Sequence, residues 1–226
     1  MDNLIIEPEV YQKIPGLIII TGIAKVENPN KDLIAEYLKT SWDKLTQEVK
    51  QHGYKTHPLI SQWRDALSHA GTPVKDFPPS IEAIAKRTEK VDKPFSINPI
   101  VDTYNAISMN LALPFGAFDL DQLQGMQKLR VSAGGESFIA LGSTENDPTT
   151  ANEIVYADDN SIITRHFMWR QSNTGKIIDS TKNIVIVCEL LDSMGADVLT
   201  KATDLIQTKF KELLNVEIQN IQILRK

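Results

Sequence analysis

The chain has 226 residues, of which 42% are hydrophobic and 23% are charged. This composition supports a compact core, and the length is near the upper limit of one domain, so we expect a single domain over residues 1–226. The formal net charge of -5 argues against a protein that grips nucleic acid across a basic face. Any contact with RNA should therefore be local.

Two further classes are disfavoured by the sequence. No run approaches the roughly 20 apolar residues that cross a bilayer, and the N-terminus lacks the features of a secretory signal, so we expect a cytoplasmic protein with no membrane partner. The single cysteine, Cys188, lies in the apolar run IVIVCELL and is expected to be a buried strand thiol. The four histidines show no ligand spacing, so we expect no metal and no cofactor.

The first half of the chain is predicted to be mainly helical. Residues 16–26 are β-branched and bounded by turn residues, which predicts a strand. Apolar residues recur at helical spacing from Asn30 to Gly53 and again from Leu59 to Ala70. Three prolines then predict a loop over residues 71–79.

Ser80 is predicted to cap a short helix over Ile81–Arg87, and Asn98 a helix that runs to about Leu111. The pattern then changes to five short segments that are predicted strands: KLRVS, SFIALG, EIVYAD, SIITRHFMW and KNIVIVCELL. A helix over Met194–Leu214 and a last strand, VEIQNIQIL, follow. The predicted class is α+β, with a β-rich core of mainly antiparallel strands and flanking helices.

One long segment carries a family resemblance. It comprises SINPIVDTYNAISMNLALPFGAFDLDQLQG (residues 96–125) and the KLRVSAGGESFIALGST that follows it, and the shared positions are Asn98-Pro99, Asp102, Asn105, Phe118-Asp119-Leu120-Asp121, Leu129-Arg130 and Gly135-Glu136. In order and spacing these resemble the tRNA-editing domain of the beta subunit of bacterial phenylalanyl-tRNA synthetase.

The resemblance covers about residues 96–190, and the first 95 residues look like the leader of free-standing relatives of that domain. We therefore expect a strand and helical leader over residues 1–95, an editing-domain-like core over 96–190, and a C-terminal helix and strand over 191–226. The fold that the resemblance implies is that of the synthetase editing domain.

The resemblance implies an aminoacyl-tRNA deacylase that acts in trans and hydrolyses the ester of a mischarged tRNA without metal or nucleotide. Its partners would be the aminoacylated acceptor end of a tRNA and the amino acid that this end carries. An aminoacyl ester is already activated, so such an enzyme needs no catalytic triad, and the sequence contains no Gly-x-Ser-x-Gly or HExxH motif. Gly116 stands where the family has a pocket histidine, and backbone amides near it would act on the ester.

The pocket candidates are Asn98, Asp102, Asn105, Gly116 and Glu136. The first three are four and three residues apart and would share one helix face beside the pocket. Two interpretations of them stay open: pocket residues, or an N-cap with solvent-facing polar neighbours. Glu136 follows two glycines, so it would either orient a substrate ammonium or serve as a hairpin-turn carboxylate.

Residues 165–171 form the second candidate group. Strand alternation would place Arg165, Phe167 and Trp169 on one face and His166, Met168 and Arg170 on the other. An arginine beside a tryptophan suits a phosphate and a stacked base; the alternative is an internal arginine–carboxylate pair with Asp158, Asp159 or Asp179. The substrate-binding candidates are Arg165, Trp169, Arg170, Gln171 and, equally ambiguous, Arg130.

Three functions therefore remain open on the sequence. The first is the trans-editing deacylase, the second is a noncatalytic module that binds tRNA, another RNA or an amino acid, and the third is a hydrolase or binder for a small aminoacyl compound. The sequence specifies neither the amino acid, the tRNA nor the oligomeric state.

Overall fold

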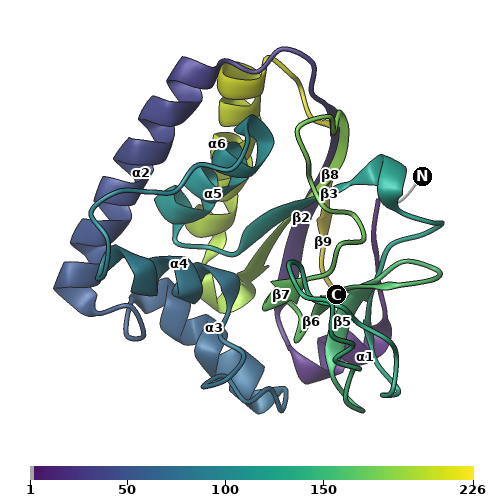
Figure 1. Cartoon of the computed structure of the whole chain (residues 1–226). Coiled ribbons are helices and arrows are strands. Elements are labelled where there is room, and N and C mark those ends of the chain that lie inside the picture. The colour runs from purple at the N-terminus through teal and green to yellow at the C-terminus, as the bar shows by residue number, and fades with distance from the viewer. Residues whose placement is uncertain (1–2) are drawn as a thin grey trace.

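The computed structural model describes residues 3–226 and shows two β-sheets beside a layer of helices (Figure 1). The helices are α1 (Pro8–Lys13), α2 (Lys31–His52), α3 (Pro58–His69), α4 (Ser80–Thr88), α5 (Pro99–Leu111) and α6 (Ala196–Leu214), with 3-10 turns at Leu120–Gln122 and Asp192–Met194. The strands are β1 (Ile5–Ile6), β2 (Leu17–Lys25), β3 (Phe115–Asp119), β4 (Lys128–Val131), β5 (Ile154–Ala157), β6 (Ile162–Arg165), β7 (Arg170–Gln171), β8 (Asn183–Leu191) and β9 (Gln219–Leu224).

The first sheet has the order β3-β8-β2-β9, and its neighbouring strands are antiparallel. β8 pairs with β2 over nine residues, from Leu17↔Leu191 to Lys25↔Asn183, and with β3 over five. Helices α2, α5 and α6 pack together beside this sheet (Figure 1). The ring of Phe115 on β3 lies 6.3 Å from the ring of Phe210 on α6, so aromatic side chains pack the sheet against the helices.

The second sheet has the order β1-β4-β5-β6-β7 and is antiparallel except for the β1–β4 pair. It joins the first sheet through buried rings, since Phe118 on β3 lies 5.7 Å from Tyr156 on β5. One hydrophobic core contains residues of both sheets. The predicted α+β class with mainly antiparallel strands is therefore confirmed.

Helix boundaries follow the capping signals closely. The Asn98 side chain accepts a hydrogen bond from the backbone of Val101 at 3.0 Å, and Asn30 accepts one from Leu33 at 3.3 Å. The assignment of Ser80 as an N-cap is wrong, because Pro79 occupies that position and Ser80 is the first residue of α4. Among residues 3–226, no helix is long and apolar enough to cross a membrane.

The predicted strand SFIALG does not form. Residues 137–142 make only the isolated bridges Ile139↔Asn146 and Ala140↔Ser172. The side chain of Asn146 accepts the backbone N–H of Phe138 at 3.0 Å, so the start of this segment folds back on its own loop. Its end touches the second sheet only at the edge, where Leu141 donates to the carbonyl of Gln171 at 2.8 Å.

The predicted strand SIITRHFMW is also wrong beyond Arg165. His166 and Phe167 have left-handed backbone angles (φ 47° and 64°), and residues 166–169 form a turn between β6 and β7. Phe167 enters the core with 0% exposure, and its N–H donates to the carbonyl of Ile154 at 2.6 Å. Burial of this ring therefore overrides the alternating pattern, and residues 165–170 do not divide between two strand faces as predicted. The last strand begins at Gln219, later than expected, and β1, α1, β3 and β7 were not predicted.

Asn98→Ala should lower the free energy of unfolding by about 1 kcal/mol, because the buried N-terminus of α5 loses its side-chain acceptor. Urea denaturation checks this. Asn30→Ala removes the longer, exposed cap of α2 and should cost less. Equal stabilities for wild type and Asn98→Ala would contradict a capping role.

Candidate functional site

A pocket of about 220 Å³ lies where the two sheets meet. The face of β3 and β8 supplies Gly116, Phe118, Val187 and Glu189, and Gly116 lies directly opposite Val187 in the ladder. Strands β5, β6 and β7, the 166–169 turn and helices α4 and α5 supply the remaining walls. Segments from both halves of the chain therefore build this site.

The size and lining of the pocket suit a small organic group. An engineered apolar cavity of about 150 Å³ holds benzene, so this volume accepts one group of amino-acid size. Phe115, Phe118, Tyr156 and Phe167 contribute aromatic surface to the walls. Ligand sites of this kind combine apolar walls with a few placed polar groups.

Gly116 leaves open space at the pocket. A Cβ placed on this residue would meet nothing within 4 Å. This position therefore leaves room that a ligand can occupy. β3 is also an edge strand, and an edge strand carries backbone N–H groups that its single neighbour does not engage.

The rim of the pocket carries a cation on an aromatic ring. Arg170 is exposed, and its Cζ lies 4.7 Å from the ring centre of the half-buried Trp169. Gln171 donates through Nε2 to the carbonyl of Gly175 at 3.1 Å. Asn105, on α5, lines the same pocket. The structure thus brings together five predicted site residues: Asn105, Gly116, Trp169, Arg170 and Gln171.

Glu189 is a pocket residue that the sequence prediction missed. It is only 3% exposed, and Oε1 accepts a hydrogen bond from the Tyr156 hydroxyl at 2.8 Å. Burial raises the pKa of the Glu189 carboxyl to about 8, against the Tyr156 hydrogen bond, which lowers it. The signal was present in the sequence: β8 is a nine-residue strand in which every residue except Asn183 and Glu189 is apolar.

Asn98 and Asp102 lie at the N-terminus of α5 and do not line the pocket. Asn98 is the N-cap, and Asp102 accepts hydrogen bonds from the Ser96 hydroxyl at 2.5 Å and the Ile97 backbone at 2.8 Å. These contacts organise the entry into the helix.

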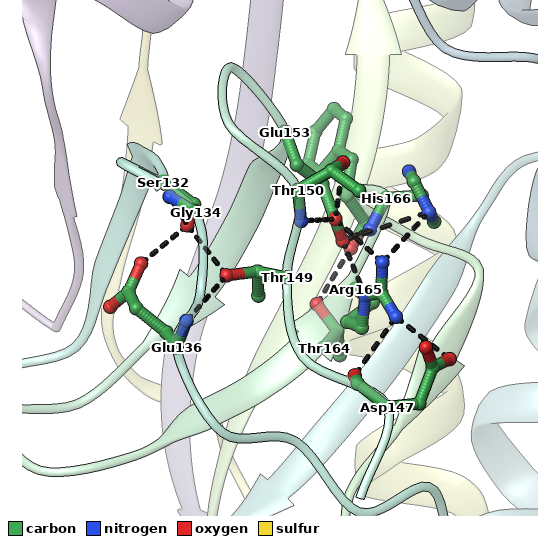
Figure 2. A network of polar contacts seen from close by, with 11 residues as sticks. Ser132, Gly134, Glu136, Asp147, Thr149, Thr150, Glu153, Thr164, Arg165 and His166 are labelled. Carbon is green, nitrogen blue, oxygen red and sulfur yellow. Dashed lines mark hydrogen bonds and ion pairs between the residues drawn. The ribbon is translucent and has the colours of Figure 1, made fainter.

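Arg130 and Glu136 bind each other. Arg130 Nη1 donates to Glu136 Oε2 at 3.0 Å, and Nη2 donates to Oε1. The Ser132 hydroxyl also donates to Glu136 at 2.5 Å (Figure 2). The Arg130 guanidinium holds the pKa of Glu136 below its usual range. Neither residue lines the pocket between the sheets.

Arg165 forms a buried ion-pair network (Figure 2). With 3% exposure, it donates through Nε and Nη2 to Glu153 at 2.9 and 2.8 Å, and Nη1 lies 2.7 Å from Asp147 Oδ2. Of the two interpretations of Arg165, the internal arginine–carboxylate pair is therefore the one that matches its contacts. The carboxylates named for that pairing were wrong: Asp158 accepts backbone N–H groups, and Asp159 pairs with Lys128.

His166 links this network to the pocket rim. Its ring stacks on Phe77 with 3.5 Å between centroids, and Phe77 in turn meets Trp169 edge-on at 4.7 Å. Burial lowers the pKa of His166 to about 4, although Glu153 acts in the opposite direction. His166 is therefore neutral near pH 7.

The titratable side chains near the pocket are sparse, and its only cysteine neighbour is buried. Within residues 3–226, no group of three or more His, Cys, Asp or Glu side chains is arranged to hold a metal ion. Cys188 is buried, and this burial raises the pKa of its thiol. The pocket contains the hydrogen-bonded pair Tyr156–Glu189, and its rim carries a cation and an indole.

A family model described as the B3/4 domain matches residues 62–211, and the chain belongs to this family. Three similar proteins are phenylalanine–tRNA ligase beta subunits. That of Photorhabdus laumondii is 30% identical over 93 residues, which cover 41% of this chain and 11% of the relative. That of Pectobacterium atrosepticum is 30% identical over 100 residues (44% and 12%), and that of Idiomarina loihiensis is 32% identical over 93 residues (40% and 11%).

The chain is thus a relative of the phenylalanyl-tRNA synthetase beta-subunit domain, as the resemblance predicted, and it matches only about a tenth of the length of these relatives. A solved N-terminal fragment of the phenylalanyl-tRNA synthetase beta subunit from Pyrococcus horikoshii aligns with 100% of this chain and 55% of its own, at 10% identity and a TM-score of 0.49.

Arg165→Met should lower the free energy of unfolding by about 3–5 kcal/mol, because Glu153 would remain buried without its partner. Denaturant titration checks this. Adding Glu153→Gln should restore part of the loss. Arg170→Ala serves as the control, since this exposed arginine should change stability by less than about 0.5 kcal/mol. Equal losses for the two arginine variants would contradict the structural assignment.

His166→Asn should weaken the pH dependence of stability, since asparagine also tolerates the left-handed backbone. Unfolded histidine binds a proton near pH 6.5, whereas native His166 does so only near pH 4. Wild-type stability should therefore fall as the pH drops from about 6.5 to about 4, by on the order of 2 kcal/mol more than in the variant. Denaturation at several pH values tests this, and parallel curves would contradict it.

Proposed function

We propose that this protein is a trans-acting deacylase that hydrolyses the ester of a mischarged aminoacyl-tRNA in cytoplasmic translation quality control. The amino-acid side chain would enter the pocket between the sheets, and the acceptor end of the tRNA would lie along its rim. The observation that carries the proposal is the juxtaposition of a 220 Å³ apolar pocket with the Arg170–Trp169 stack.

The rim has the chemistry for the end of a single strand. A guanidinium binds phosphate in a bidentate manner, and an indole offers a face on which a base stacks. Arg170 is exposed, whereas Arg165 and Arg130 are held by carboxylates. We therefore assign the phosphate contact to Arg170. A local contact of this kind is compatible with a net charge of -5.

The pocket has the chemistry for an aminoacyl group. Hydrolysis of an activated ester requires a water molecule, a fixed ester and donors to the developing oxyanion. Backbone amides of the edge strand β3 beside Gly116, a residue of the pocket wall, would supply the donors. Asn105 and Gln171 would position the polar end of the aminoacyl group.

The relatives support tRNA as the partner, because those compared above are named as phenylalanine–tRNA ligase beta subunits. The apolar lining favours an uncharged amino-acid side chain. The names of these relatives also favour this assignment over a binder of small aminoacyl compounds unrelated to tRNA.

A noncatalytic tRNA- or amino-acid-binding module is the second candidate. It is favoured by Gly116, which has no side chain where the resemblance implies a pocket histidine. Such a module would use the same pocket and rim, so binding alone does not separate it from the deacylase. Turnover does.

Arg170→Ala should reduce release of the amino acid from its preferred mischarged tRNA by at least about tenfold, because the phosphate loses a charged partner. The assay measures release from a panel of correctly and wrongly charged tRNAs with chelator present. Arg87→Ala is the matched control, since Arg87 stacks on Phe95 at 4.6 Å outside the pocket. Trp169→Ala and Gln171→Ala test the rest of the rim.

Selective release by wild type and by Arg87→Ala, with loss in Arg170→Ala, supports the deacylase. Salt-dependent binding of tRNA without release above spontaneous hydrolysis across the panel would instead favour the binding module. Equal rates for the two arginine variants would remove Arg170 from the site.

A further inference from the structure

We propose that Glu189 is the general base of the pocket and takes the proton from the water that attacks the aminoacyl ester. This inference rests on the deacylase proposed above and adds a catalytic residue to it. Its basis is the position of one carboxyl group, placed by the central strand β8 at the inner wall of the pocket.

The geometry of β8 gives Glu189 this position. Residues two apart in a strand point to the same face, so Glu189 lies on the same face as Val187, which is opposite the open space at Gly116. The Glu189 side chain is only 3% exposed, yet it lines the pocket. A water molecule between Glu189 and Gly116 would lie beside the edge-strand amides of β3.

A buried carboxyl with this environment is unusual as a purely structural group. On β2, its ladder partner is Ile19, which offers no hydrogen bond from its side chain. Replacing a buried ionisable group by an apolar one is often neutral or stabilising, so packing alone does not account for a glutamate here. A role in proton transfer accounts for this glutamate. A general base works best with a pKa near the working pH, and burial raises the pKa of Glu189 to about 8.

The surrounding groups leave Glu189 as the proton acceptor. The titratable or charged groups that adjoin it or line the same pocket are Tyr104 on α5, Tyr156 on β5, Arg170 on β7 and Cys188 beside it on β8. Burial raises the pKa of Tyr104, Tyr156 and Cys188, so none of these three ionises near neutral pH. Arg170 is at the exposed rim and stacks on Trp169.

The step balances without any other reactant. The ionised Glu189 carboxylate accepts a proton from water while the water oxygen forms a bond to the ester carbonyl carbon. The tetrahedral intermediate then collapses, the bond from that carbon to the ribose oxygen breaks, and the proton held on Glu189 passes to the leaving oxygen. The products are the free amino acid and the tRNA, and Tyr156 is the positioning residue that fixes the carboxyl through its hydroxyl.

Glu189→Gln should lower the rate of amino-acid release by about 100-fold or more, the usual contribution of a general base. The chain is assayed from pH 6 to 9.5 on the mischarged tRNA that wild type prefers, with spontaneous hydrolysis subtracted at each pH. Wild-type activity should rise with pH through the titration of Glu189. The residual activity of Glu189→Gln should lack this rise and show only the titration of the substrate.

Tyr156→Phe provides a second, independent readout. The Tyr156 hydroxyl donates to Glu189 and so stabilises the carboxylate. Its removal should shift the midpoint of the pH profile to higher pH, whereas a residue that only fills the core would leave the midpoint unchanged. Thermal unfolding of both variants checks that they fold, and Glu89→Gln, an exposed carboxyl outside the pocket, is the control.

The outcomes separate this inference from the function on which it rests. Wild-type turnover with a strong loss in Glu189→Gln and a shifted profile in Tyr156→Phe supports both. If the wild type turns over and Glu189→Gln keeps its rate within threefold with the same pH midpoint, the role of Glu189 is overturned. The proposed deacylase function is then still supported. Absence of turnover in the wild type at every pH overturns both.

Discussion

Strand β8 pairs with β2 along its whole length and with β3 along more than half of it, and this ladder determines where the pocket can form. A shift of one residue would turn the pocket face of β8 toward the opposite side. Glu189 would then leave the pocket and Cys188 would enter it. Strand β2 therefore holds the site in register, although none of its residues lines the pocket.

Glu153, which precedes β5 of the second sheet, and Glu189, on β8 of the first sheet, are buried carboxylates with opposite shifts in pKa. Glu153 is compensated by Arg165 and by backbone N–H groups, and its pKa is lowered. Glu189 has a tyrosine hydroxyl as its partner, and its pKa is raised to about 8. The first arrangement stabilises a fold, whereas the second keeps a proton exchangeable near neutral pH. Only the second lies in the pocket between the sheets.

Local signals in the sequence predicted the helices well, because a cap such as Asn98 acts within one turn. They failed where distant residues decide the backbone. His166–Trp169 alternates like a strand but turns, since Phe167 has to fill the core. The rim residues were found from their unusual types. Glu189 was missed because only the pairing of β8 with β3 shows that its side chain faces a pocket.

The most direct test of the central claim is a crystal structure of the protein with adenosine that carries an aminoacyl group through a nonhydrolysable 3′-amide. We expect the aminoacyl group beside Glu189 and Gly116, with the adenine on Trp169. Binding in the separate cavity of about 550 Å³ beside Arg165 and His166, or no binding at millimolar concentration, would contradict the assignment of the site.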